Sequence, residues 1–169
     1  MPTIAMYPGS FDPVTNGHLD IIKRSSRMFD KVIVAVLVNS AKTPLFTVEE
    51  RVAMLRDACK NIPNVEIDSF NGLTVTFAKQ KGATVMVRGL RAVTDFENEI
   101  QLAHTNFAMM PEIETVFLAT AIKWSYLSST IVKEAAYYGS DISKFVTPNV
   151  EKAVNEKYAL IRQKKDPET

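Results

Sequence analysis

Residues 3–18, TIAMYPGSFDPVTNGH, join an apolar run to a loop of glycine, proline and small hydroxyl residues. The run over 3–7 has the length of a buried strand, and apolar residues at helical spacing follow from 17 to 29. A strand, a loop and a helix in this order form the first half of a βαβ unit, whose strands pair in parallel. This stretch therefore predicts an α/β protein with a parallel sheet.

The alternation of strand-length and helix-length segments continues along the chain. Thr47 with Glu50, and Thr94 with Glu97, match the capping box that opens many helices. We expect one domain over 1–163, a Rossmann-like, doubly wound, five-stranded parallel sheet with helices on both faces and a C-terminal helical segment, followed by a flexible tail at 164–169. Further strands are expected at 32–38, 65–69, 84–88 and 115–118, and helices at 48–61, 73–81, 95–110, 128–138 and from 147 onward.

The composition narrows the classes of function. The chain has 169 residues, 46% of them hydrophobic, which is enough for one well-packed core. Because 20 basic residues stand against 19 acidic ones, we expect no nucleic-acid partner. The start of the chain lacks a leader pattern and no stretch has the length of a membrane span, so we expect a cytoplasmic protein with no membrane partner. The single cysteine, Cys59, is expected to be a buried, unbridged thiol.

The loop after the first strand is the first candidate for a ligand site. In a doubly wound sheet, ligands bind beyond the carboxyl ends of the strands, where the strand order reverses. The loop over 7–18 has the glycines and the helix start that favour a phosphate group. It lacks both the G-x-G-x-x-G spacing of dinucleotide-binding enzymes and the lysine of a P-loop, which disfavours both classes. His18, on the first turn of the helix, can turn toward such a phosphate or can simply cap the helix.

Three further polar segments follow other expected strands, at 39–44, 88–91 and 123–130. Each segment alone could be a solvated loop. Together they are expected to bring Lys42, Arg88, Arg91 and His18 around one crevice, beside a helix start rich in hydroxyl groups. This combination predicts a pocket for several phosphate groups.

At these positions the chain resembles the nucleotidyltransferases with a T/H-x-G-H signature, and among them the phosphopantetheine adenylyltransferase family. Two positions depart from the usual pattern: Ser10 stands where a threonine also occurs, and LSST at 127–130 stands where the family often has isoleucine and three serines. Both substitutions keep the hydroxyl groups. The resemblance rests on YPGSFDP at 7–13, TNGH at 15–18, FTVEER at 46–51, RGLR at 88–91, DFE at 95–97 and the segment from Trp124 to Lys133.

The resemblance implies an enzyme that transfers the adenylyl group of ATP reversibly to 4′-phosphopantetheine, giving dephospho-coenzyme A and pyrophosphate. The terminal phosphate of the acceptor would attack the α-phosphorus of ATP. A phosphate monoester has its second pKa near ~6, so the nucleophile is largely ionised at neutral pH and needs no general base. The protein would act by positioning and by stabilising charge.

The resemblance also implies a role for individual residues. His18 would stabilise the transition state, with Lys42 and Arg91 as further catalytic residues. The acceptor would contact Ser10, Lys42, Thr74 and Arg88. The ATP side would comprise Ser10, Phe11, His18, Gly89, Leu90, Arg91, Glu99, Trp124, Ser125, Tyr126, Leu127, Ser128, Ser129 and Thr130.

The sequence pattern supports some of these expectations less strongly than others. Glu99 lies beside an apolar stripe of its helix and could equally be a solvated glutamate. Mg²⁺ is expected as the cofactor, held by the phosphates of ATP and not by the protein, because the sequence shows no obvious carboxylate cage. His104 has no partner pattern and is interpreted as structural or as a surface residue. The resemblance further implies a homohexamer and feedback inhibition by coenzyme A.

Other functions remain open at this point. A nicotinamide mononucleotide adenylyltransferase or a cytidylyltransferase would keep 15–18 and change the acceptor pocket. A class I aminoacyl-tRNA synthetase shares a related signature, but this chain is too short for an anticodon-reading region. A regulatory module that senses ATP without turnover would explain the nucleotide loop but not Lys42 and Arg88.

Overall fold

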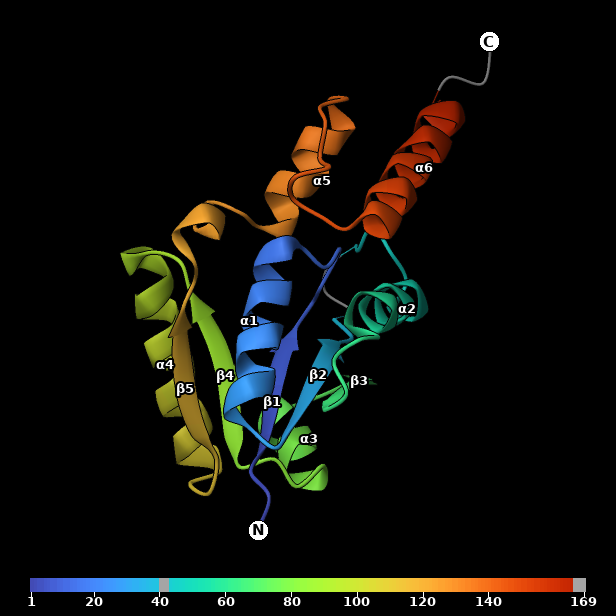
Figure 1. Cartoon of the computed structure of the whole chain (residues 1–169). Coiled ribbons are helices and arrows are strands. Elements are labelled where there is room, and N and C mark those ends of the chain that lie inside the picture. Colours follow the sequence, from blue (N-terminus) through green and yellow to red (C-terminus); the bar gives the residue numbers. More distant parts are fainter. Residues whose placement is uncertain (40–42, 166–169) are drawn as a thin grey trace.

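The computed structural model describes residues 1–39 and 43–165. Its centre is a five-stranded sheet in the order β3-β2-β1-β4-β5, in which every neighbouring pair is parallel (Figure 1). This order reverses between β1 and β4, as the doubly wound prediction requires. The strands are β1 (Ile4–Gly9), β2 (Lys31–Leu37), β3 (Val65–Phe70), β4 (Val85–Leu90) and β5 (Glu114–Ala119).

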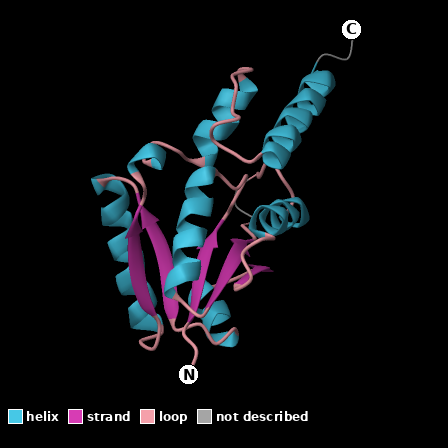
Figure 2. Cartoon of the chain, viewed as in Figure 1, coloured by secondary structure: helices cyan, strands magenta, loops and turns pink. Residues whose placement is uncertain are grey.

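Helices cover both faces of the sheet, which confirms the predicted layers (Figure 2). One face packs against α1 and α2, and the other against α3 and α4. The helices α5 and α6 extend beyond the carboxyl edge of the sheet (Figure 1). The helix bounds are α1 (Asn16–Met28), α2 (Val48–Cys59), α3 (Thr74–Gln80), α4 (Val93–Met109), α5 (Ser129–Tyr137) and α6 (Pro148–Lys165), with a short 3₁₀ turn η1 (Ile122–Trp124).

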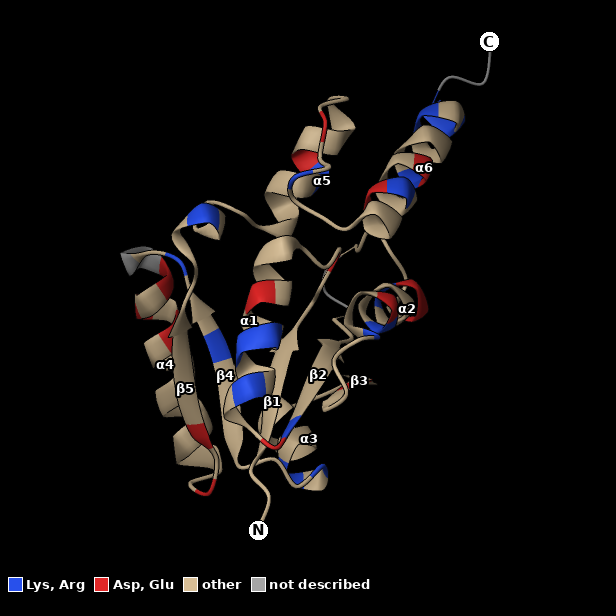
Figure 3. Cartoon of the chain, viewed as in Figure 1, with Lys and Arg blue, Asp and Glu red and all other residues tan. Residues whose placement is uncertain are grey.

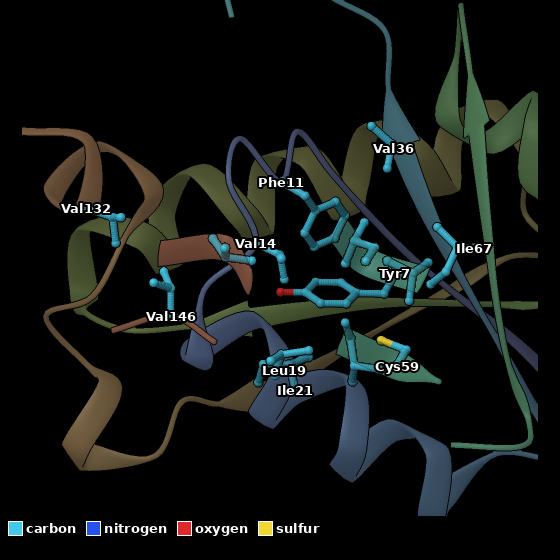
Figure 4. Close-up of a cluster of buried hydrophobic side chains, with 14 of the residues drawn as sticks. Tyr7, Phe11, Val14, Leu19, Ile21, Val36, Cys59, Ile67, Val132 and Val146 are labelled. Carbon is cyan, nitrogen blue, oxygen red and sulfur yellow. The ribbon is translucent and has the colours of Figure 1, made fainter. Parts of the chain in front are cut away.

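The core has two layers, one on each face of the sheet, because side chains alternate along each strand. Because successive strand residues point to opposite faces, Val34 lies in one hydrophobic layer and Ile33 in the other, and both are buried. This explains why β2 is apolar without interruption after Lys31. Figure 4 shows the larger layer, where the rings of Tyr7 and Phe11 meet edge to face with their centroids 5.3 Å apart. Cys59 is buried in this layer as predicted, and burial raises the pKa of its thiol to about 11.

A capping box was predicted at the start of two helices, and the structure confirms only one of them. At α2, the Thr47 hydroxyl accepts the Glu50 amide and the Glu50 carboxylate accepts the Thr47 amide, so the predicted capping box is confirmed. The box predicted from Thr94 is wrong, because α4 already begins at Val93. The Asp95 carboxylate instead accepts the backbone amide of Arg91, 3.2 Å away, just before the helix.

The other boundaries differ from the prediction at strand ends and at the C-terminus. The strands β1 and β4 run two residues further than expected, because the parallel register continues to Gly9 opposite Val36 and to Leu90 opposite Ala119. The expected tail at 164–169 also changes: Lys164 and Lys165 belong to α6, and 166–169 lie outside the described residues.

Charged residues of both signs are interspersed over the molecule in the view of Figure 3. In the described part of the chain, no helix combines the length and the apolar character needed to cross a bilayer.

Candidate active site

A cavity of about 230 Å³ opens where β1 and β4 part at the carboxyl edge of the sheet. Its floor is the end of these two strands, one wall is the start of α1, and the opposite walls come from α4, η1 and the start of α5. It therefore lies at the topological switch point, where the sequence analysis placed the ligand. The predicted residues that line it are Phe11, His18, Arg88, Gly89, Arg91, Glu99, Trp124, Leu127, Ser128 and Ser129.

His18 caps its helix and also lines the cavity, two placements that the sequence analysis treated as alternatives. It is the third residue of α1, and its Nδ1 accepts the backbone amide of Thr15 at 3.0 Å, while the Thr15 hydroxyl accepts the His18 amide. This is a capping box in which imidazole replaces the usual glutamate. Because a backbone N–H can only donate, Nδ1 carries no proton in the neutral ring. The proton is therefore on Nε2, on the other side of the ring, and His18 lines the cavity.

The surroundings of His18 keep its imidazole neutral. Burial, and then the positive charges of Arg91 and Arg88, lower the pKa of His18 from 6.5 to about 4. The edge-to-face contact with Phe11, at 5.0 Å between the centroids, helps to hold the ring in this orientation. His18 is thus a neutral hydrogen-bond donor held in one orientation.

Arg88 and Glu99 form a bidentate ion pair on the cavity wall. Nε and Nη2 of Arg88 each donate to a different oxygen of Glu99, both at 2.6 Å, and Nη1 donates to the carbonyl of Pro8 at 3.1 Å. The pair joins the end of β4 to α4 and to β1. Glu99 is therefore not the solvated glutamate that its helical position left open, and Arg88 is held in place before any ligand binds.

Arg91 follows β4 directly and is oriented by two other segments. Its Nε donates to Asp95 at 3.1 Å, and its Nη1 donates to the carbonyl of Leu127 at 3.1 Å. The guanidinium thereby bridges the first turn of α4 and the segment that leads into α5. This places a positive charge close to the start of α5, where an anion is favoured.

The start of α5 supplies hydroxyl groups, but two of them are already engaged. Ser128 is the N-cap residue, and its hydroxyl accepts the amide of Ile131. The Ser129 hydroxyl donates to the carbonyl of Pro13 at 2.7 Å, which ties α5 to the loop after β1. The first amides of a helix have no backbone partner within the helix, and since Ser128 takes that of Ile131, the amides before it are the ones left to face an anion here.

A second cavity of about 180 Å³ adjoins the first, with Ser129 in the lining of both. Ser10 and Thr130 lie here, together with Arg51 and Lys133. Asp12 fixes its shape: the carboxylate accepts the backbone amides of Leu45 and Phe46, both at 2.9 Å, and pairs with Lys133 at 3.4 Å. The described residues of the predicted site thus line two adjoining cavities that share Ser129.

Some predicted residues are not in either lining. Lys42 lies outside the described residues. Thr74 is the first residue of α3, and Leu90 ends β4. Tyr126 is half exposed and packs against Phe145. Ser125 donates its hydroxyl to the carbonyl of Ile122 within the turn. His104, expected to be structural or superficial, is exposed on α4.

The cavity also contains residues to which the sequence analysis assigned no role in the site. Tyr7 is buried under the floor with its hydroxyl pointing away from Ile67 and Cys59 (Figure 4), and burial raises its pKa well above the usual range. Asp95 and Thr120 line the walls. Asp95 could have been found from its spacing of four residues after Arg91 on a helix start, whereas nothing in the sequence marks Thr120.

These features can be set beside known proteins. The model of the cytidylyltransferase-like family matches residues 6–135 of the chain. Among solved structures, the fold resembles a Plasmodium falciparum nicotinic acid mononucleotide adenylyltransferase complexed with NaAD, with a TM-score of 0.66, 15% identity, and coverage of 96% of this chain and 97% of that one. The chain belongs to the cytidylyltransferase-like family and is a nucleotidyltransferase.

Curated relatives narrow the family further. A phosphopantetheine adenylyltransferase of Lachnoclostridium phytofermentans is 57% identical over 155 residues, which cover 92% of this chain and 95% of the relative. A second, from Nostoc sp. (strain PCC 7120), is 57% identical over 147 residues, which cover 87% of this chain and 77% of the relative. Within the nucleotidyltransferases, this chain belongs with the phosphopantetheine adenylyltransferases.

Proposed function

We propose that this protein catalyses the reversible transfer of the adenylyl group of ATP to 4′-phosphopantetheine, with release of pyrophosphate, as a step of coenzyme A synthesis. The observation that carries this proposal is the geometry of His18, whose Nδ1 is held by the Thr15 amide so that Nε2–H is the donor left for the cavity. Membership of the phosphopantetheine adenylyltransferases supports the identity of the acceptor.

The reaction needs no base from the protein. The acceptor phosphate is already largely ionised at neutral pH, since its second pKa lies near ~6. It attacks the α-phosphorus, negative charge accumulates on the equatorial oxygens, and pyrophosphate leaves. A neutral Nε2–H donor on His18 stabilises that charge without having to lose a proton first, which suits its lowered pKa of about 4.

The remaining side chains bind and orient. We assign the nucleotide to the first cavity, where Arg91 and the start of α5 meet its phosphates and Gly89 lets the backbone approach closely. A side chain at Gly89 would contact Ile21, whose nearest carbon lies 3.4 Å from the position of the added Cβ. We assign Ser10 to the contact between the two substrates, because it lies in the second cavity beside the first.

We propose Mg²⁺ as the cofactor, bound mainly by phosphate oxygens and water. The carboxylates that line the first cavity, Asp95 and Glu99, are each paired with an arginine, so neither offers a free ligand set. In the described part of the chain no cluster of three histidine, cysteine or acidic side chains could hold the ion. The ion would neutralise charge on the triphosphate.

The quaternary structure, regulation and location are also proposals. We propose a homohexamer, and the half-exposed rings of Phe96 and Phe107 on α4 are a surface that such an assembly could cover. Coenzyme A is proposed as a feedback inhibitor, because it contains the product of the reaction. A cytoplasmic location is proposed as well.

The experiment that tests the function measures pyrophosphate release from ATP and Mg²⁺ with 4′-phosphopantetheine, beside pantetheine without its phosphate. We expect release only with the phosphorylated acceptor. Release with nicotinamide mononucleotide and not with phosphopantetheine would assign the protein a different acceptor. Binding of ATP without release under any acceptor would favour an ATP sensor.

A further inference from the structure

Arg51 is a buried arginine with an unusual set of partners. It is 4% exposed, yet it belongs to α2, a surface helix whose sequence is rich in charge. Its Nε donates to the carbonyl of Thr47 at 3.3 Å, and its Nη1 donates to the carbonyls of Ser10 at 2.9 Å and Leu37 at 3.3 Å. All three partners are neutral.

The charge of Arg51 therefore has no anionic partner within the described protein. Over residues 1–39 and 43–165, no carboxylate lies within 4.0 Å of its guanidinium nitrogens. Asp12 is the acidic residue in the same cavity lining, but its oxygens are taken by two backbone amides and by Lys133. A guanidinium stays charged at neutral pH, and a buried charge without a counter-ion is costly.

The position of this charge suggests what compensates it. Arg51 lines the second cavity, next to Lys133 and to the hydroxyl-bearing residues Ser10, Thr43 and Thr130. Arg51 and Lys133 outweigh the single negative charge of Asp12, so the described lining has a net positive charge. Cations and hydroxyl groups together are the partners that a phosphate group prefers. The hydrogen bond to the Ser10 carbonyl also fixes the loop that links both cavities.

We propose that Arg51 is a positioning residue for a phosphate group bound in the second cavity, holding Ser10 in place and supplying from behind it the positive charge that the phosphate pairs with. The phosphate is either that of the acceptor or part of the pyrophosphate, since both carry the same chemistry. The inference rests on the proposed function, which requires two phosphate-bearing ligands side by side.

The test separates the charge of Arg51 from its contribution to the fold. Dissociation constants are measured for 4′-phosphopantetheine, for pantetheine without its phosphate and for inorganic pyrophosphate, in the wild type, Arg51→Gln, Arg51→Met and Arg51→Lys. The control is Arg162→Gln. Arg162, on α6, also donates to two backbone carbonyls, of Ala136 and Tyr137, but these lie at the C-terminal end of α5 and Arg162 lines neither cavity. Melting temperatures are recorded for every variant.

The readout is the preference for a phosphorylated ligand. If the acceptor's phosphate occupies the cavity, the uncharged variants lower the ratio of pantetheine to 4′-phosphopantetheine dissociation constants by about tenfold. If pyrophosphate occupies the second cavity, the dissociation constant of pyrophosphate rises by a similar factor in the uncharged variants. Arg51→Lys keeps most of the preference because it keeps the charge, and Arg162→Gln keeps all of it.

Two uncharged variants, Arg51→Gln and Arg51→Met, are included because the test needs only one of them to fold. A lower melting temperature with unchanged preference for phosphate in both ligand arms would overturn the inference and leave Arg51 a structural residue. If the wild type itself showed no preference for the phosphorylated acceptor, the proposed function would fail instead, so the two failures can be told apart.

Discussion

Replacing His18 by asparagine and by alanine should separate the two roles of its imidazole. An asparagine side chain has an oxygen at the position of Nδ1, so it can still accept the Thr15 amide that now lies 3.0 Å from the ring. It has no group at the position of Nε2. Alanine removes both functions, so His18→Asn and His18→Ala share the loss of the donor and differ only in the cap.

The expected size of each effect follows from general values for such interactions. Losing one donor to the charge that develops in a transition state costs about 100- to 1000-fold in turnover, and we expect that loss in both variants. Losing a capping interaction costs about 1 kcal/mol, which lowers the melting temperature of a domain of this size by about 2–4 °C. We therefore expect His18→Ala to melt a few degrees below His18→Asn.

The assays are steady-state pyrophosphate release, ATP binding by calorimetry, and thermal unfolding. ATP binding should change by less than about threefold in both variants, since the donor acts mainly in the transition state. Near-normal turnover of His18→Asn would refute the Nε2 donor. Equal melting temperatures for the two variants would refute the capping role and with it the assignment of the proton to Nε2.

Further predictions follow from other parts of the structure. Glu99→Ala should lower stability by about 1–2 kcal/mol, discounted for partial exposure, and weaken substrate binding, because it leaves Arg88 uncompensated; unchanged unfolding in urea would show that the pair contributes nothing. Thr47→Ala should lower stability by about 1 kcal/mol in chemical unfolding without a change in turnover, since the capping box at α2 lies outside the cavity linings; a large loss of turnover would contradict this. Below pH 6.5 an unfolded histidine takes up a proton, whereas folded His18 does so only near its pKa of about 4, so stability should fall over this interval and fall less steeply in His18→Asn; parallel curves of unfolding free energy against pH would contradict the lowered pKa. Cys59 should react with a thiol reagent only after denaturant is added, because it is buried with a pKa of about 11; rapid labelling of the native protein would argue against its place in the core.

The general position of the site was predictable from the sequence because it depends on topology. The parallel strands place their carboxyl ends on one edge, so the loops after β1, β4 and β5 had to meet there. His18 was found for the same reason. The tautomer of His18 could not be predicted, because it depends on the capping contact of Nδ1. A capping box usually has glutamate or glutamine at the third helical position, and here that residue is histidine.

The partners of individual residues were less predictable. Glu99 lies 11 residues after Arg88, across a turn from strand to helix, and helical periodicity carries no information about that distance. The charged stretch from Val48 to Arg51 looks like a solvated helix start, yet Arg51 is buried because three carbonyls from different segments converge on it. Such contacts depend on packing between elements and leave no local pattern.

The hydrogen bond from Ser129 to the Pro13 carbonyl joins residues 116 positions apart in the chain. Both cavities have walls from the first fifteen residues and from the segment after β5, so neither exists until nearly the whole sheet has assembled. Contacts of such long range form late and slow the folding of a domain. A nucleotide would therefore bind the native chain and no partly folded form, and its binding free energy would add fully to the stability of the folded state.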